Sequence, residues 1–171
     1  MSIDEMIDNS KWDVRFLALA EHVSQWSKDP STKVGAVITR PDRTVASIGY
    51  NGFPRGCSDD ELLYLDRDTK LSRIVHAEMN AILHAREPLH DHTLYVWPPG
   101  LGPTCDRCAA HVIQAGIRRV VGVLPEAGEE DPTAQRWADA CKTAHRLYEE
   151  AGVSVRMWTW GGFNLMRKAR Y

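Results

Sequence analysis

The stretch TLYVWPPGLGPTCDRCAAHVIQAGIRRVVGVL, residues 93–124, alternates the signals of strand and helix. TLYVW, rich in β-branched and aromatic residues, predicts a strand, and PPGLGP predicts a rigid loop. A helix is expected from Cys105 to Ala115 and should end at Gly116, because glycine readily adopts the left-handed conformation that closes many helices. RRVVGVL predicts the next strand. A strand that is reached through a helix is typical of α/β folds.

The segments before this stretch predict helices and a hairpin. From Trp12 to Trp26 apolar residues recur at intervals of three and four, which predicts a helix with one buried face, closed by Asp29-Pro30. VGAVIT and TVASIGY, joined by a turn that contains proline, predict the two strands of a hairpin. Residues 60–69 favour a short helical excursion, and another helix is expected from about His76 to Glu87.

The segments after it complete the fold prediction. A long helix is expected from Pro132 to about Ala151, VSVRMWT predicts a last strand, and the tail from Gly161 to Tyr171 is expected to pack on a neighbour or to fray. The order α-β-β-α-β-α-β-α-β predicts a three-layer α/β/α fold with a central mixed five-stranded sheet. Because 171 residues are too few for two domains of average size, a single domain over residues 1–171 is expected.

The composition excludes several classes of protein. Apolar residues make up 43% and charged residues 26%, with a formal net charge of −2, as in an ordinary globular protein of the cytoplasm. No apolar run approaches the ~20 residues of a membrane span, and MSIDEMIDNS does not resemble a signal peptide. No stripe of Lys and Arg indicates nucleic-acid binding. The four cysteines are expected to be free or metal-bound: Cys57, Cys105, Cys108 and Cys141.

Two of these cysteines form a CxxC motif at the start of a predicted helix. Cys105 and Cys108 are three apart and share a helix face, and the positive end of the helix dipole favours the thiolate form that binds zinc. One CxxC is a weak signal, because it also fits half of a zinc ribbon, a redox pair or two core residues. A ribbon needs a second CxxC, which the sequence lacks, and a redox pair would prefer an aromatic residue where Thr104 stands.

A third ligand must come from elsewhere in the chain, and the seven histidines are the candidates. His90 and His92 lie in a predicted loop with no further ligand nearby, whereas His76 begins a helix, two residues before Glu78. The remaining histidines fall inside predicted helices, where a lone histidine is usually a surface or core residue: His22, His84, His111 and His145.

His76 and Glu78 allow two interpretations: solvated residues at a helix start, or a ligand and the acid beside it. Because i and i+2 point to nearly opposite sides of a helix, the second requires His76 in the very first turn. A His/Cys/Cys set leaves the fourth zinc position to water, as in catalytic sites. Glu78 would then move protons while an amidine-like carbon is attacked and ammonia expelled.

Several motifs together carry a resemblance to a known family. H-x-E followed by a CxxC, with DPSTKVGAVI, GYNGFPRGCSDD, HAEMNAIL and CDRCAAHVIQAGIRRVV, resembles the zinc-dependent deoxycytidylate (dCMP) deaminases over residues 27–123. The resemblance implies that His76, Cys105 and Cys108 bind Zn²⁺ and that Glu78 is the proton shuttle. It also implies that zinc-bound hydroxide attacks C4 of cytosine while Glu78 protonates N3 and then the departing amine, giving dUMP and ammonia.

The resemblance extends to substrate contacts and assembly, with a small-molecule nucleotide as the partner. Asn51 corresponds to an asparagine that contacts the sugar or base, although Asn-Gly is also a common turn pair. The phosphate needs a cation, and the candidates are Lys33, Arg55 and Arg86. Family members assemble as homo-oligomers, so a dimer or a hexamer is expected.

This sequence also departs from the family pattern. Thr104 stands where the family has a proline before the first cysteine, and LPEAGEEDPTAQRW replaces a strand end that normally carries aspartate, lysine and tyrosine. The segment between Cys57 and His76 is shorter than in many members. Two alternatives therefore stay open: a related deaminase acting on a free base, a nucleoside or a modified deoxycytidylate, and a non-enzymatic protein with a structural zinc.

Overall fold

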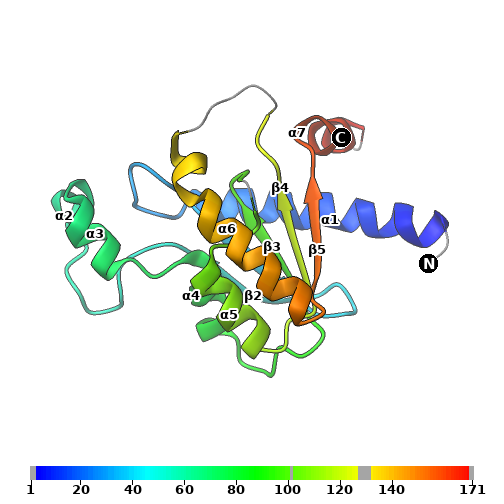
Figure 1. Ribbon diagram of the computed structural model, residues 1–171, viewed down its shortest axis with the longest axis horizontal. Coiled ribbons are helices and arrows are strands. Elements are labelled where there is room, and N and C mark those ends of the chain that lie inside the picture. Colours follow the sequence, from blue (N-terminus) through cyan, green and yellow to red (C-terminus); the bar gives the residue numbers. More distant parts are fainter. Residues whose placement is uncertain (1–2, 101, 127–131, 170–171) are drawn as a thin grey trace.

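The computed structural model describes residues 3–100, 102–126 and 132–169, and its centre is one mixed sheet (Figure 1). The strand order is β2-β1-β3-β4-β5. β1 is antiparallel to both β2 and β3, whereas β3, β4 and β5 are parallel. The strands are β1 (Gly35–Thr39), β2 (Val45–Tyr50), β3 (Thr93–Trp97), β4 (Arg119–Val123) and β5 (Ser154–Trp158). The predicted mixed five-stranded sheet is confirmed.

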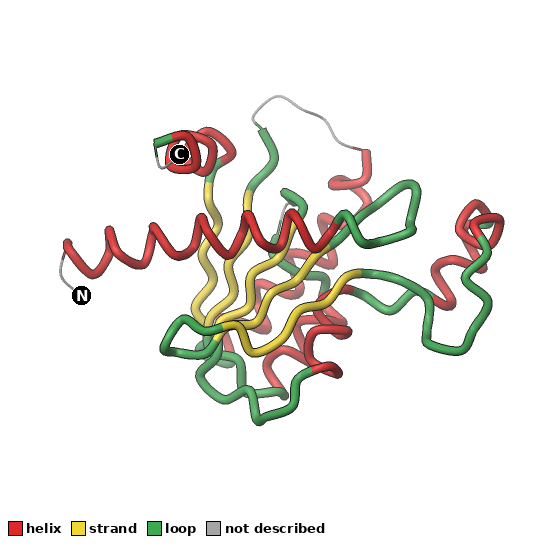
Figure 2. Tube along the Cα trace, turned by 180° about the vertical axis from the view of Figure 1, so that it is seen from behind, coloured by secondary structure: helices red, strands yellow, loops and turns green. Residues whose placement is uncertain are grey.

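Helices cover both faces of this sheet, so the molecule has three layers. One face carries α4, α5 and α6, and the other carries α1, which crosses behind the strands in Figure 1 and in front of them in Figure 2. α2 and α3 extend away from the sheet in both views. The helices are α1 (Ile3–Ser24), α2 (Glu61–Leu65), α3 (Arg67–Arg73), α4 (Ala77–His84), α5 (Asp106–Gln114), α6 (Pro132–Glu150) and α7 (Trp160–Lys168).

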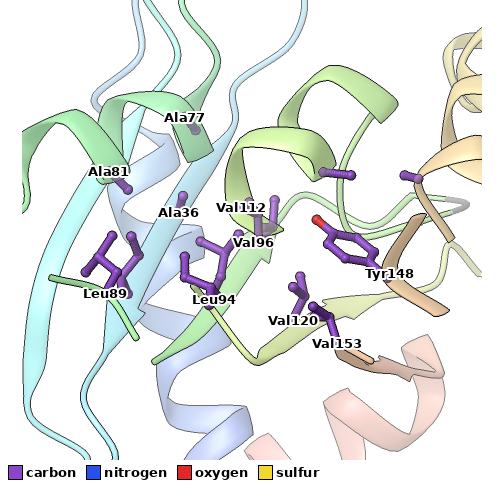
Figure 3. Packing of buried hydrophobic residues seen from close by; sticks show 14 residues of the cluster. Ala36, Ala77, Ala81, Leu89, Leu94, Val96, Val112, Val120, Tyr148 and Val153 are labelled. Atoms are coloured by element: carbon purple, nitrogen blue, oxygen red, sulfur yellow. The ribbon is translucent and has the colours of Figure 1, made fainter. Parts of the chain in front are cut away.

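Side chains along each strand alternate between the two faces of the sheet, so the hydrophobic core consists of two clusters, one on each face. Successive strand residues point to opposite sides, so Ala36 and Ile38 face α4, α5 and α6 while Val37 faces α1. Figure 3 shows the first of these clusters, in which Tyr148 of α6 packs with strand valines. Both faces are apolar, as expected for strands buried between layers of helices.

One glycine allows α4 to lie directly on the sheet. A Cβ atom added to Gly49 of β2 would clash with the Ala77 carbonyl oxygen and the Ala81 amide nitrogen. Ala77 and Ala81 are both fully buried. Small residues on both elements therefore bring the start of α4 close to the sheet edge.

The structure corrects the sequence prediction at both ends of the chain. α1 begins at Ile3, nine residues before the predicted start at Trp12, and it ends at Ser24. The C-terminal tail contains α7, in which Thr159 caps the helix through the amide of Gly162 and Phe163 is fully buried. The tail was not predicted as a helix because few of its residues are apolar. These residues form a buried face only by packing against α1 and β3.

Two helix ends also differ from the prediction. α4 ends at His84 rather than Glu87, because Ala85 already has extended backbone angles. The expected excursion over residues 60–69 is two short helices, α2 and α3, the second of which reaches Arg73. Among the helices of the described residues, none is long and apolar enough to cross a membrane.

Candidate metal centre and cavity

His76 occupies the residue directly before α4. Its backbone is extended, at φ −68° and ψ 154°, and its carbonyl oxygen accepts the first helical hydrogen bond from the Asn80 amide at 2.9 Å. The preceding residue, Val75, exchanges two backbone hydrogen bonds with Gly52, at 2.9 and 3.1 Å. The imidazole makes no capping bond to its own helix, so it is free to point elsewhere.

Cys105 occupies the corresponding position before α5. Its backbone is extended, its thiol makes no capping bond, and its carbonyl oxygen accepts from the Ala109 amide at 2.9 Å. The preceding Thr104 forms a buried hydrogen bond of 2.8 Å between its hydroxyl and that of Tyr148 on α6. Thr104 is therefore tied to a neighbouring helix.

The two helix starts bring three possible ligands together. His76 Nδ1 lies 3.5 Å from the Cys105 sulfur and 3.3 Å from the Cys108 sulfur, and all three atoms lie within 4.8 Å of one another. Zinc bonds of ~2.0–2.3 Å at tetrahedral angles place two ligand atoms roughly 3.6 Å apart. The donor set and its spacing therefore fit a zinc ion with three protein ligands.

The charges in this cluster favour a thiolate. A hydrogen bond from Cys108, together with the His76 ring, lowers the pKa of the Cys105 thiol to about 4, although burial opposes this shift. The same hydrogen bond and burial raise the pKa of Cys108. The hydrogen bond with Cys105 raises the pKa of His76. A zinc ion would bind the sulfurs as thiolates and displace the proton that they share, because zinc binds the deprotonated forms.

Glu78 is a buried carboxyl beside these ligands. It is only 4% exposed, it lies in the first turn of α4, and the Cys108 thiol is among the groups that hydrogen-bond to it. Burial raises its pKa, since removing water disfavours the charged form. A buried carboxyl with a raised pKa can both accept and donate a proton during a reaction.

A cavity of about 630 Å³ opens in front of this cluster. His76, Glu78 and Cys105 line it, and so do Asn51 and the exposed Lys33. The other two predicted phosphate cations, which are Arg55 and Arg86, are exposed and do not line this cavity. The structure thus brings together the predicted ligands, the predicted acid and two of the four predicted substrate contacts.

Asn51 is buried and bonded within the protein. Its amide nitrogen donates to the Thr32 carbonyl oxygen at 2.8 Å and to Asp29 Oδ2 at 3.3 Å, and its Oδ1 accepts from the Val34 amide at 2.8 Å. These bonds hold the loop of residues 29–34 against the end of β2. Asn51 therefore has a structural role in the cavity wall, and its contact with a substrate stays a prediction.

Sequence reasoning missed an ion pair in the same wall. Lys70 of α3 donates to both carboxylate oxygens of Asp29, at 2.8 and 2.6 Å, and to the Ser31 hydroxyl at 2.6 Å. Burial alone would raise the pKa of Asp29, but the bonds from Lys70 and from the loop amides lower it. In the sequence, Asp29-Pro30 indicated only the end of a helix. No sequence pattern linked Asp29 to a lysine on another element.

Two further cavity residues come from α6, for which no site role was predicted. Trp137 and Cys141, one turn apart, both line the cavity. Trp97 also lines it, but its ring packs with Trp160 and Phe163 on the α1 side of the sheet. Tyr95, in the same strand, is buried and donates to Asp13 at 3.1 Å.

The fold is shared with a solved deaminase. The dCMP deaminase of the cyanophage S-TIM5 matches with a TM-score of 0.60 at 20% sequence identity, covering 92% of this chain and 99% of that one. At this identity the likeness shows a shared fold, so the mixed sheet with helices on both faces is the fold of a deaminase. The predicted fold class is confirmed.

The sequence comparisons define the family. Residues 10–124, more than half of the chain, match the cytidine and deoxycytidylate deaminase zinc-binding region, and the chain belongs to this deaminase family. An uncharacterized deaminase of Aliivibrio fischeri is 40% identical over 160 residues, covering 92% of this chain and 99% of the relative. The deoxycytidylate deaminase of Mus musculus is 36% identical over 158 residues, covering 89% and 82%. The predicted family and the prediction of an enzyme are confirmed.

Proposed function

We propose that this protein hydrolyses dCMP to dUMP and ammonia with a zinc ion bound by His76, Cys105 and Cys108. The observation that carries the proposal is the meeting of two helix starts, which places these ligands and the buried carboxyl of Glu78 at the wall of one cavity. Relatives named deoxycytidylate deaminases, at 36% identity over most of the chain, support dCMP as the substrate.

Glu78 performs the proton transfers of this reaction. A zinc ion in the site supplies Lewis acidity that makes water a usable nucleophile near neutral pH. Glu78 takes a proton from the attacking water as its oxygen bonds to C4, and it delivers that proton to N3. Glu78 then takes the remaining proton of the oxygen added to C4 and passes it to the amino group. The C4–N bond breaks, ammonia departs, and a carbonyl forms at C4.

The cavity rim supports a role for Lys33 in binding the phosphate. Lys33 is exposed at the rim, whereas the ammonium of Lys70 already donates to Asp29 and Ser31. Of the three predicted cations, Lys33 is the one that lines the cavity. We therefore assign the phosphate contact to Lys33.

The proposal includes a homo-oligomer, a dimer or a hexamer, in the cytoplasm. Large apolar side chains of the described residues are exposed over several elements and provide surface for such contacts: Tyr50, Leu62, Leu65 and Leu83. Light scattering of the purified chain measures the number of copies. A monomer at micromolar concentration would contradict this part of the proposal and leave the reaction untouched.

Ammonia release from dCMP, deoxycytidine, cytosine and guanine tests the reaction, with Glu78→Gln as the control variant. We expect release from dCMP, and a drop in kcat of about 10²–10⁴-fold in Glu78→Gln with unchanged zinc content, because Gln keeps the shape but cannot carry the proton. Release from deoxycytidine or cytosine but not dCMP would favour a related deaminase. A zinc-loaded protein inert on all four would remove the enzyme, and full activity of Glu78→Gln would remove the mechanism.

A further inference from the structure

Trp137 of α6 is an exposed aromatic residue at the metal centre. It remains 40% exposed and lines the cavity, and its ring meets that of His76 edge to face, with centroids 6.3 Å apart and planes at 83°. Large aromatic side chains usually bury most of their surface. Here an indole surface is left open beside a predicted metal ligand.

The packing of α6 fixes the position of this ring. Trp137, Cys141, Ala144 and Tyr148 follow at intervals of four, three and four, so they share one face of the helix. Ala144 and Tyr148 are fully buried in the core cluster shown in Figure 3, and Tyr148 is bonded to Thr104 beside Cys105. The helix that carries Trp137 is therefore anchored to the residue directly before Cys105, which is one of the predicted metal ligands.

The chemistry of the cavity wall fits a planar heterocycle. The His76 and Trp137 rings stand nearly at right angles, so a flat ring that stacks on one of them turns its own edge towards the other. His76, Glu78 and Trp137 line the same cavity, so a ring whose reacting carbon approaches Glu78 occupies the cavity that the open indole also lines. Covering the open indole would add apolar burial and ring contact to binding.

We propose that Trp137 is a substrate-binding residue that forms a wall for the pyrimidine base and so helps to determine specificity. This inference rests on the proposed function, since the base is that of dCMP. A role for Trp137 in supporting the His76 ring alone predicts a different experimental result. If Trp137 only held the His76 ring in place, its removal would lower zinc affinity and kcat rather than the affinity for nucleotide.

Steady-state kinetics of Trp137→Ala and Trp137→Phe separate these roles. For Trp137→Ala we expect KM for dCMP to rise about tenfold, with kcat within about threefold and zinc content unchanged, because binding is lost equally in the ground and transition states. Calorimetry should show dUMP binding weakened by the same factor. Trp137→Phe, which keeps an aromatic face, should recover most of the affinity. Trp26→Ala is the matched control, since Trp26 is 49% exposed and does not line the cavity.

Each contrary result has one meaning. Unchanged KM and dUMP affinity in Trp137→Ala, in an enzyme that deaminates dCMP, would overturn the inference alone. Loss of zinc from Trp137→Ala would mean that Trp137 supports His76. A changed oligomer mass with unchanged KM would mean that Trp137 lies in an interface between copies. Either result would overturn the inference. A wild type that releases no ammonia from dCMP would remove the proposed function and the inference with it.

Discussion

The metal centre and the cavity rim are built in different ways. The ligands come from two helix starts, where His76 and Cys105 each stand one residue before a helix and Cys108 follows in the first turn. The rim is the part of the cavity wall formed by the loop of residues 29–34 and by α3. It is built from long-range contacts, in which Asp29 of the loop binds Lys70 of α3, 41 residues later. Local chain geometry therefore aims each ligand from its helix start, whereas the contacts of the rim have no local counterpart and arise only in the folded chain.

This difference has a physical cause. Helix starts leave backbone amides unpaired and aim side chains out of the helix, so residues there can meet a ligand or an ion in a defined direction. An ion pair between two separate elements has no such local signature. We therefore expect changes at the ligands to remove the activity, and changes at the supporting contacts to alter stability by smaller amounts.

Removal of a ligand should have the largest effect. Cys105→Ala should abolish stoichiometric zinc binding and lower kcat/KM for dCMP by about a thousandfold or more, because two protein ligands hold the ion poorly. Metal analysis and ammonia release measure the two effects. Cys57→Ala is the matched control, since Cys57 is an exposed free cysteine in a loop. Zinc and activity retained in Cys105→Ala would show that the metal centre lies elsewhere.

A change directly behind the ligands should have an intermediate effect. Thr104→Val removes the partner of the buried Tyr148 hydroxyl at nearly constant volume, and it should lower the free energy of unfolding by about 2 kcal/mol. Urea unfolding of the zinc-loaded protein measures this. Adding Tyr148→Phe removes the stranded hydroxyl, so the double variant should be more stable than Thr104→Val alone. A Thr104→Val protein as stable as the wild type would show that the bond contributes nothing.

A change at the rim should have the smallest effect, and it should depend on pH. Lys70→Met should lower the free energy of unfolding by about 1 kcal/mol at pH 7, because Asp29 loses one partner while the amides of Ser31 and Thr32 still donate to it. The pKa of Asp29 is lowered in the folded protein. Its ion pair therefore contributes above the unfolded pKa of ~3.9, and the contribution is lost as pH falls through the lower folded value.

The stability difference between wild type and Lys70→Met should thus shrink progressively below about pH 4. Urea unfolding at a series of pH values measures it. Lys142→Met is the control, because Lys142 and Asp139 form an exposed pair at 3.6 Å, and its removal should have almost no effect at any pH. A Lys70→Met difference that stays constant down to pH 3 would mean that the ion pair is not its source.

Much of the fold was predictable because the strands carry strong local patterns. TLYVW coincides with β3, and the helix expected after PPGLGP begins one residue later than predicted, because Cys105 is the cap of α5. α7 was not predictable in the same way. Phe163 is buried only because it packs against α1 and Trp97. So few apolar residues in a short helix form no periodic pattern in the sequence.

Parts of the site were equally beyond the sequence. Arg55 and Arg86 had the right charge for a phosphate, but both lie outside the cavity, because charge says nothing about which surface a side chain occupies. Trp137 gave no signal either, since an aromatic residue at helical spacing usually belongs to the core. Its position at the cavity depends on how α6 packs against α5 and the loop before Cys105.

The sequence by itself determined the class of chemistry and the alternation of strands and helices. Residue types at helix starts and periodic apolar patterns act over a few positions, and such local effects can be read along the chain. The tertiary structure alone decided that the starts of α4 and α5 meet within ligand distance, and that Asp29 finds Lys70. It also decided which cations and aromatic rings face the cavity, because these positions follow from the packing of elements far apart in the sequence.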